Sequence, residues 1–528
     1  MLLTRGRVWG KMGSVRVGLL IGACGWLVTG CSNAPSVGGL AAAGGQPGLG
    51  GAGAADANQA DPRTGSGGTS LVARGGAGSG GRAGVETDLP AAGSGDGWTG
   101  GGMTAAGGNG AAEPKHYPGQ GFIVHEWGTD TIVVGSNGSL QRGLHHEEED
   151  LPAFVYDRMK AGTLIGSAPS PSVTIKMETP VTYFYSPTAL SVTARVDFPK
   201  GVLTQWYPGV KDFRPSLAAA GSVAANVPAV LSDPALDLTF PFVGEMCRAK
   251  FGSVSAGWLD WGTVSVGARG AAPAKPLPGA PLEQFGWSYA RAVDANLVEA
   301  ASGESERFLF YRGLGDFELP VTVRAETAGK VTFTNGYSEP VAQVFLLNVN
   351  QEHGAFAVHA GGIAPSATLT GTVPSLEGAS SVDEYAQRLS DAVITALDAT
   401  GLYHDEAVAM VNTWRRQWFR TPGVRALYLL PQSWTEQSIP LSISPKPDAT
   451  VRVMLIRVEL ITQEQESADV GALSSFGSDA LAGAAYFSAL GRFAEPRLRR
   501  ALQLSPSAAG EKYLAQIESA PSSVTSGE

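Results

Sequence analysis

About 85 residues of this chain, from Ser32 to about Pro118, are mainly glycine, alanine and serine, with almost no large apolar side chains. Such a segment buries too little apolar surface to offset the conformational entropy that folding removes. We therefore expect residues 31–118 to form a disordered tether. A flexible coil of that length has a root-mean-square reach of roughly 50 Å. Folded structure is expected to begin near residue 119.

The first 30 residues have the features of an export signal. An apolar run from Val17 to Val28 follows a basic flank made of Arg5, Arg7, Lys11 and Arg16. The run is too short to cross a bilayer as a helix but has the length of a signal-peptide core. Residues 1–30 are therefore predicted to be a signal peptide. Met12 is an alternative start, because Arg16 alone still supplies the positive flank.

The end of this leader, Val28-Thr29-Gly30-Cys31, places small residues before a cysteine. It resembles the lipobox of bacterial lipoproteins, in which that cysteine becomes the lipidated first residue. The resemblance implies lipid attachment at Cys31, where several lipid chains anchor far better than one. Because Ser32 rather than aspartate follows, it also implies an outer-membrane protein that faces the periplasm or the cell surface. The alternative is an ordinary secretory signal with an incidental cysteine.

Charge and cysteine content limit the classes of partner. Removing residues 1–30 takes away four positive charges and no negative one, so the formal net charge falls from −10 to −14. A chain this acidic is a poor candidate for binding nucleic acid or an anionic membrane surface. Cys24 leaves with the leader and Cys31 carries lipid, so Cys247 has no disulfide partner and is expected to be a buried thiol.

Between residues 119 and 376 the apolar pattern predicts short strands. In Leu190–Phe198, apolar and polar residues alternate as in a half-buried strand. Prolines and glycines separate such runs, and several short strands at this spacing are typical of a sandwich. Two ambiguous segments, Leu151–Lys160 and Ser288–Ala300, also fit a short helix.

From about residue 380 the apolar period becomes that of helices, with Ser381 as the expected N-cap of the first one. Val451–Ile461 then returns to strand and begins apolar on both faces, which is typical of a central strand. The predicted fold class is α+β. A β-sandwich-like, β-rich domain over 119–376 is followed by a smaller α+β domain over 377–528.

The region after the tether contains three motifs: His125-Glu126-Trp127-Gly128-Thr129, Phe308-Leu309-Phe310-Tyr311-Arg312-Gly313 and Arg492-Phe493-Ala494-Glu495-Pro496-Arg497. In these motifs it resembles an uncharacterised family of secreted bacterial proteins. The motifs spread over about 121–500, which favours one integrated unit. The family pattern has an aromatic residue where this chain has Asp130. The resemblance implies membership and no mechanism.

The densest group of metal-ligating residue types is His145-His146-Glu147-Glu148-Glu149-Asp150, with His125-Glu126 on the strand before it. Histidine and carboxylate side chains bind zinc and similar divalent ions. The candidate ligands are His125, His145, His146 and Glu147, with Glu126 as a general base. The spacing matches no established metal motif. The alternative is a solvated acidic turn that caps a helix over 151–160.

Other polar residues have plainer interpretations. His353 and His359 flank a turn and are expected to be surface residues with hydrogen bonds, although they could be ligands. His404-Asp405-Glu406 is expected to cap a helix. Arg457 and Glu459 share one face of an apolar strand and are expected to pair with neighbours.

These observations support two functional hypotheses. No serine lies in a G-x-S-x-G pattern and no phosphate-binding loop is present. We therefore favour a membrane-anchored lipoprotein with a binding or structural role toward envelope proteins or glycans. The alternative is a metal-dependent hydrolase, with a divalent metal as cofactor, that uses the His125/His145/His146 region.

Overall fold

The computed structural model describes residues 97–100, 115–144, 148, 151–157, 173–214, 257–277 and 286–519, which form a mixed α+β structure with large sheets. All of them belong to one compact unit, Pro90–Glu528. The predicted signal peptide, most of the predicted tether, Cys31 and Cys247 lie outside the described residues.

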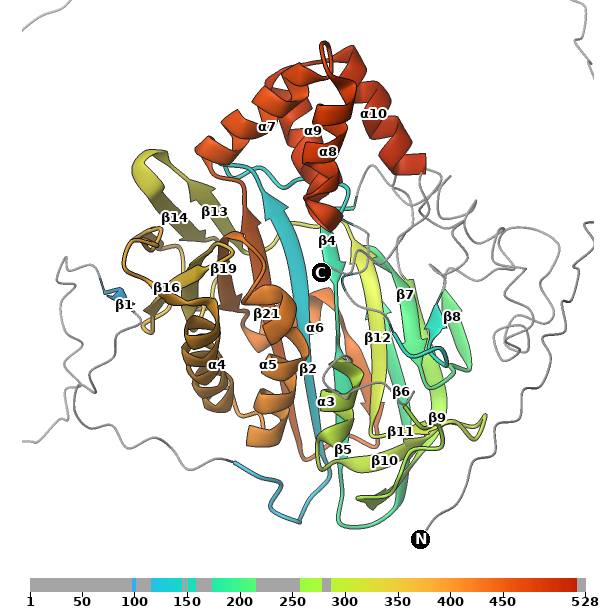
Figure 1. The fold of residues 1–528 in the computed structure, drawn as a ribbon. Helices are drawn as coiled ribbons and strands as arrows, with labels where there is room; N and C mark the ends of the chain where they lie inside the picture. Colours follow the sequence, from blue (N-terminus) through green and yellow to red (C-terminus); the bar gives the residue numbers. More distant parts are fainter. Residues whose placement is uncertain are drawn as a thin grey trace, which may run out of the picture. The chain divides into compact units, whose positions relative to one another are not determined.

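β2 (Ile123–Val134) is a central strand of a twelve-stranded sheet (Figure 1). It pairs in parallel with β21 (Ala449–Leu460) along its whole length. On its other side it pairs antiparallel with β4 (Ile175–Met177) and β5 (Val181–Tyr185). The other strands of this sheet are β1 (Thr99–Gly100), β3 (Tyr156–Asp157), β7 (Gly201–Tyr207), β12 (Phe308–Gly315), β15 (Val344–Val349), β16 (His353–His359), β18 (Ser380–Ser381) and β19 (Gly423–Leu429).

β21 confirms that Val451–Ile461 forms a central strand. β19 and β21 lie between β15 and β2 in the sheet, so strands from both sides of residue 376 alternate in it. A strand that is apolar on both faces has no solvent face and needs packing partners above and below. The apolar pattern predicted a domain boundary between residues 376 and 377. In the structure, strands from both sides of that boundary belong to the same large sheet.

One apolar core joins a face of the large sheet to two smaller sheets. Val124 and Ile132 of β2 point into it, as do Val192 and Val196 of β6 (Leu190–Phe198). The alternation predicted for β6 is confirmed. The six-stranded sheet also contains β8 (Asp212–Arg214), β9 (Gly257–Arg269), β10 (Asn296–Glu299), β11 (Ser305–Glu306) and β20 (Leu441–Ser444), and the three-stranded sheet contains β13 (Val321–Ala325), β14 (Lys330–Asn335) and β17 (Thr368–Thr372).

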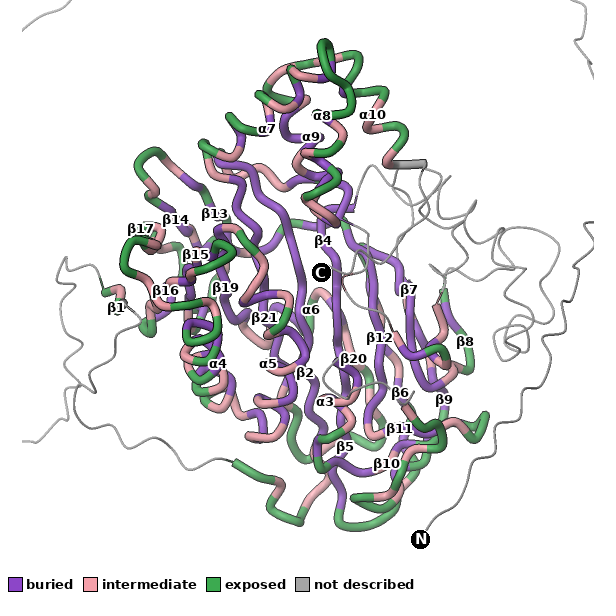
Figure 2. Tube along the Cα trace, viewed as in Figure 1, coloured by how far each residue is buried: buried purple, intermediate pink, exposed green. Residues whose placement is uncertain are grey.

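Helices cover the opposite face of the large sheet and form a second core with it. They are α3 (Gly286–Ala292), α4 (Val382–Ala399) and α5 (His404–Trp418) (Figure 1). α4 begins as predicted, because the Ser381 side chain accepts a hydrogen bond from the Glu384 backbone N–H. Figure 2 shows the consequence: the central strands are buried between two layers, and the outward sides of the helices are exposed.

A group of helices near the C-terminal end has a small apolar core of its own. It consists of α7 (Gln463–Ser475), α8 (Ala480–Ser488), α9 (Ala494–Leu504) and α10 (Ala508–Ser519), and we call it the helical cap. A separate short helix, α6 (Gln432–Ser438), follows β19. Within the described residues no helix is long and apolar enough to cross a bilayer.

Of the two ambiguous segments, one contains no helix in its described residues, and the other is helical only in its first part. Within Leu151–Lys160, the described residues 151–157 contain no helix; Tyr156 instead pairs with β7 and stacks on Trp206 at 6.1 Å between ring centroids. The segment Ser288–Ala300 divides into α3 and β10, because the Asn296 side chain donates hydrogen bonds to backbone carbonyls of neighbouring segments. Non-local contacts override a weak helical pattern in both places.

Candidate functional site

The two residues of the His125-Glu126 pair lie on opposite faces of β2. Successive side chains of a strand alternate between the faces of a sheet. His125 bonds to α5 on the helix-covered face, whereas Glu126 bonds within the core between the sheets. The hydrolase hypothesis requires both side chains to lie near one metal ion. In the structure they point to opposite faces of the sheet, with the backbone of β2 between them.

His125 forms a buried pair with Glu406 in the first turn of α5. Its Nδ1 atom lies 2.7 Å from Glu406 Oε2, and the side chains are 3% and 0% exposed. Glu406 Oε2 also accepts a hydrogen bond from the Tyr403 backbone N–H, so the expected capping role is confirmed. One carboxylate therefore caps a helix and orients an imidazole on a strand.

Three tyrosines surround this pair. The Tyr185 hydroxyl donates to Glu406 Oε1 at 2.8 Å, while the Tyr403 ring lies 4.3 Å from the His125 ring. Tyr117, which is half-buried, packs against both of these tyrosines. Burial and the nearby Glu406 carboxylate raise the pKa of Tyr185 well above its ordinary value. Tyr185 therefore remains a proton donor at any physiological pH.

The pair has a defined chemical capacity. A carboxylate at Nδ1 favours the tautomer with the proton on Nδ1, which leaves the Nε2 lone pair to accept a proton or bind a metal ion. Within the part of the chain that the structure describes, His125 Nε2 makes no hydrogen bond. Oriented imidazoles of this kind serve as bases or metal ligands when a substrate or ion can reach them.

Glu126 is enclosed by partners in the opposite core. Its carboxylate accepts from Arg452 Nε at 2.7 Å, from the Tyr311 hydroxyl at 2.6 Å and from the Thr182 hydroxyl at 3.1 Å. Glu126 is 1% exposed and Arg452 is 3% exposed. A carboxylate with a charged partner and two hydroxyl donors has a structural role that accounts for its burial.

The remaining predicted ligands, His145, His146 and Glu147, lie outside the described residues. Their neighbour Glu148 is described, and it accepts hydrogen bonds from Arg457 and Arg492. Arg457 pairs in register with Thr131, six positions along β2 from His125. At about 3.3 Å per residue, this register is roughly 20 Å from His125 along the sheet.

Glu148 belongs to a buried network of alternating charges at the end of β21. Arg457 donates to Glu148 and to Glu459, and Arg425 donates to Glu459 at 2.8 Å. Arg492 bridges Glu148 to Glu178 and so extends the network. The pairing expected for Arg457 and Glu459 is confirmed.

The arginines decide the charge state of these carboxylates. Burial alone would raise the pKa of Glu459, but Arg425 and Arg457 outweigh it and hold that pKa below its usual range. Glu148 behaves in the same way, because Arg457 and Arg492 overcome its desolvation and lower its pKa. Both glutamates are therefore ionised in the folded protein at neutral pH.

Asp130 has the opposite environment. It lies opposite Met177 on β4 and Ile456 on β21, and both neighbours belong to the apolar core between the sheets. Neither of its carboxylate oxygens has a hydrogen-bond partner among the described residues. Burial first, and then the Glu178 charge, raises the pKa of Asp130 to about 8. At pH 7 the folded protein therefore holds this carboxyl mostly in its protonated form.

A cavity of about 190 Å³ lies between the end of the large sheet and the helical cap. Its lining is largely apolar and includes Val424, Leu490 and Phe493, with Glu459 and Arg497 as charged members. Arg497 pairs with Asp469 and Glu459 with two arginines, so both charges are already neutralised by protein partners.

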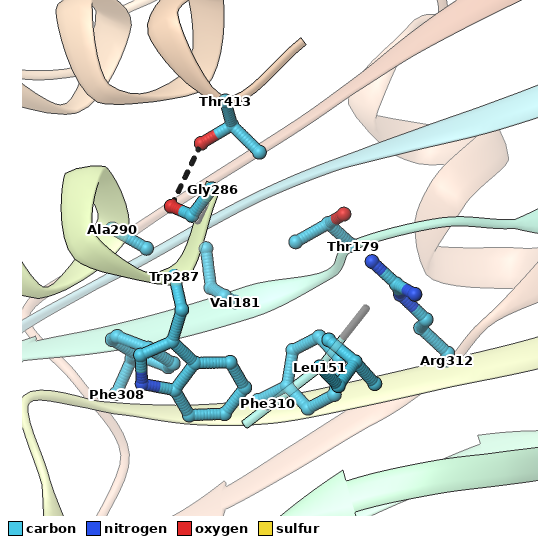
Figure 3. Close-up of a pocket in the computed structure, with 10 residues that line it drawn as sticks. All are labelled: Leu151, Thr179, Val181, Gly286, Trp287, Ala290, Phe308, Phe310, Arg312 and Thr413. Atoms are coloured by element: carbon cyan, nitrogen blue, oxygen red, sulfur yellow. Dashed lines mark hydrogen bonds between the residues drawn. The ribbon is translucent and has the colours of Figure 1, made fainter. Parts of the chain in front are cut away.

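A second, much smaller cavity of about 10 Å³ lies between α3, α5, β5 and β12 (Figure 3). Phe308, Phe310 and Trp287 make one side of it apolar, and Arg312 lies at one end. The Thr413 hydroxyl donates to the Gly286 carbonyl at 3.3 Å across the helices. This volume is near the least that holds one water molecule.

His353, His359 and His404 each have separate partners. His353 lies beside Glu352 at 3.9 Å, His404 lies 3.0 Å from Asp398, and His359 lies 3.2 Å from the Gly97 carbonyl. In the described ranges, no three histidine, cysteine, aspartate or glutamate side chains form a group that could hold a metal ion.

No family model matches the chain, and no curated protein sequence matches it. Solved structures that resemble it include the yeast delta-COP-I mu-homology domain complexed with a Dsl1 WxWxV peptide. That match has 8% sequence identity, covers 64% of this chain and 96% of the other, and has a TM-score of 0.22. A TM-score this low carries no argument about the fold or the function of this chain.

The sequence indicated His125 but not its surroundings. Glu406 was identified only as a helix cap, and Tyr117 and Tyr185 carried no motif at all. The partners are separated from His125 by as many as 281 positions. A capping glutamate that follows a tyrosine at the N-cap is the one local signal that pointed to this region.

Proposed function

We propose that the chain is a lipid-anchored protein of the outer membrane whose folded region has a binding or structural role in the cell envelope. The observation that carries the proposal is the sequence of the leader, which ends in Val28-Thr29-Gly30-Cys31. Cys31 would carry the lipid. The acidic charge of the chain is consistent with protein or glycan partners and disfavours nucleic acid. The folded region would face the periplasm or the cell surface, at a root-mean-square distance of roughly 50 Å from the bilayer.

We also propose that the β-rich part is sandwich-like. The support is the apolar core to which β2 and β12 of the large sheet and β6 and β9 of the six-stranded sheet all contribute. Face-to-face sheets that share such a core are the defining feature of sandwiches. A rigid scaffold of this kind suits a protein that presents surfaces to partners.

The anchoring part is tested by membrane fractionation. Cys31→Ser should move the protein from the membrane fraction to the soluble fraction, because the lipid acceptor is lost. Cys247→Ser is the matched control, since it makes the same change at the other cysteine that the predicted mature chain retains. Membrane association that persists in Cys31→Ser would refute Cys31 as the anchor.

One observation favours a second candidate, the metal-dependent hydrolase. The buried His125–Glu406 pair is the arrangement in which a carboxylate orients a metal-binding imidazole. Metal analysis of the purified protein should then find stoichiometric metal that is lost in His125→Ala and in His145→Ala/His146→Ala. His353→Ala, at a half-exposed site, is the control. Protein without bound metal after incubation with zinc would rule the hydrolase out.

A further inference from the structure

Residues Gly97–Gly100 of the predicted tether are part of the fold. Thr99 and Gly100 form β1, which pairs antiparallel with Val358 and Ala357 of β16 (Figure 1). β1 thereby adds an outer strand to the large sheet. The other end of the same edge is covered by β18, which pairs with His353 and Gly354. The stretch Ala355–His359 is thus the part of this sheet edge at which a short extended segment can pair, and β1 occupies it.

Trp98 fixes this segment through its side chain. The indole Nε1 donates to the Thr370 carbonyl at 2.7 Å, and the ring lies 6.1 Å from the Phe333 ring and 5.6 Å from the His359 ring. The indole also packs closely on Gly371, where a Cβ would lie only 2.8 Å from the ring. We call the contact surface that Phe333, His359, Thr370 and Gly371 form around the indole the tryptophan pocket.

The sequence around Trp98 suits this role. Trp98 is the single phenylalanine, tyrosine or tryptophan between Ser32 and His116, and glycines stand on both sides of Trp98-Thr99. Small neighbours let the backbone approach a sheet edge closely, while one large ring supplies buried area. Strand addition with one side-chain pocket is an established mode of peptide recognition, in which backbone bonds give affinity and the pocket gives specificity.

We propose that the Ala355–His359 edge and the tryptophan pocket form a peptide-binding site for extended segments that present a tryptophan. Gly97–Gly100 is its occupant in the same chain, and a tryptophan-bearing segment of an envelope protein competes for it. The inference deepens the proposed binding role and rests on it for the partner. The occupancy by Gly97–Gly100 stands independently, on the contacts of Trp98.

Two paired residues and one ring hold the segment, so the contact is short enough to exchange. Gly97–Gly100 has an advantage over a free peptide because it is attached to the same chain. For a short flexible linker, such attachment gives a millimolar effective concentration. A free peptide must overcome this competition. Removal of the Trp98 ring should therefore expose the site to peptides added in solution.

The test uses the full chain and a fluorescent synthetic peptide of residues Ser94–Met103, followed by anisotropy. The peptide should bind Trp98→Ala on the order of tenfold more tightly than the unaltered chain, because the internal competitor is lost. Trp98→Ala/Gly371→Leu should not bind, since leucine fills the pocket. Trp98→Ala/Thr372→Leu should still bind, because residue 372 points to the opposite face of β17.

Three outcomes would overturn the proposal: no binding to a stably folded Trp98→Ala chain, equal binding to the Gly371→Leu variant, or equal binding of a peptide in which alanine replaces the tryptophan. Hydrogen exchange of Ala355–His359 supplies a second measurement and should be faster in Trp98→Ala than in the unaltered chain. Unchanged exchange would refute the occupancy by Gly97–Gly100. None of these results depends on the Cys31→Ser fractionation.

A second copy of the chain is the competing occupant. If its Gly97–Gly100 segment filled the site, light scattering would show a dimer that grows with concentration and disappears in Trp98→Ala. That result would overturn the assignment to the same chain. A mass that stays monomeric and is unaffected by the substitution supports it.

Discussion

His125 Nδ1 lies 2.7 Å from Glu406 Oε2, although 281 positions separate the two residues. The bond ties the first turn of α5 to β2, so the helix layer and the central sheet share one buried polar contact. Glu406 also accepts from Tyr185 and from the Tyr403 backbone. Loss of the Glu406 carboxylate would leave several buried hydrogen-bond donors without an acceptor. Each unsatisfied buried donor lowers the free energy of unfolding.

We expect Glu406→Gln to lower the free energy of unfolding by about 2–3 kcal/mol, because a neutral amide replaces a carboxylate that accepts several buried hydrogen bonds. Glu384→Gln is the matched control, since Glu384 occupies the same helical position in α4 but is exposed. It should cost less than about 1 kcal/mol. Urea denaturation at pH 7 measures both, and equal losses would contradict the structural role of Glu406.

Asp130 should make stability fall as pH rises. The pKa of Asp130 is raised to about 8 in the folded protein, against about 4 in the unfolded chain. Between these values the folded state keeps a proton that the unfolded state has lost. The free energy of unfolding should therefore fall by about 1.4 kcal/mol per pH unit across that window and level off above it.

Asp130→Asn should remove this slope, because an amide does not titrate. At pH 7 the variant should be more stable than the native chain by on the order of 4 kcal/mol. Urea denaturation at pH 5, 7 and 9 measures the slope. Asp383→Asn, at a side chain that is 80% exposed, is the control and should leave the slope unchanged. A slope that persists in Asp130→Asn would show that another group causes it.

Local patterns predicted the elements whose burial follows a simple period. β6 alternates, β21 is apolar on both faces, and α4 begins at a serine N-cap. α7 escaped prediction because it has no apolar stripe; it buries Asp469 and Glu466 as partners of arginines on α9. Ion pairs between distant segments allow charged residues to be buried, and such pairs leave no periodic pattern in the sequence.

The candidate site was predictable only in part. The His125-Glu126 motif was expected on a strand, but the strands that pair with β2, which include β21 and β5, are set by long-range contacts. The β-rich and α+β halves looked separable because strands precede helices along the chain. Parallel pairing of β2 with β21 brings the two ends of the fold together, and such pairing requires a long connection.

The charge network at the end of β21 should fail if one partner is removed. Arg457→Met should lower the free energy of unfolding at pH 7 by about 3–5 kcal/mol, because it leaves Glu148 and Glu459 buried with one cation fewer. Arg195→Met is the control: its pair with Asp197 is about one-third exposed, so the loss should stay below about 1 kcal/mol. Denaturation with urea distinguishes the two.

The same network fixes the response to acid. Glu148 and Glu459 have lowered pKa values, so their contribution is present above the pKa of the unfolded chain, about 4.3, and is lost as pH falls through the folded-state values. The difference between Arg457→Met and the native chain should therefore shrink as pH falls below 4. A difference that stays constant down to pH 2 would contradict ionised glutamates in the network.

The helical cap should open independently of the sheets, because its core of Leu473, Phe476, Phe487, Leu498 and Ala501 is separate from the two large cores. Phe487→Ala removes a fully buried ring and should cost about 3–5 kcal/mol within the cap. Leu481→Ala in the same helix is the control, since Leu481 is 84% exposed. Hydrogen exchange should become faster in α7–α10 and remain unchanged in β2 and β21. Equal acceleration in the sheet would show that cap and sheets unfold as one unit.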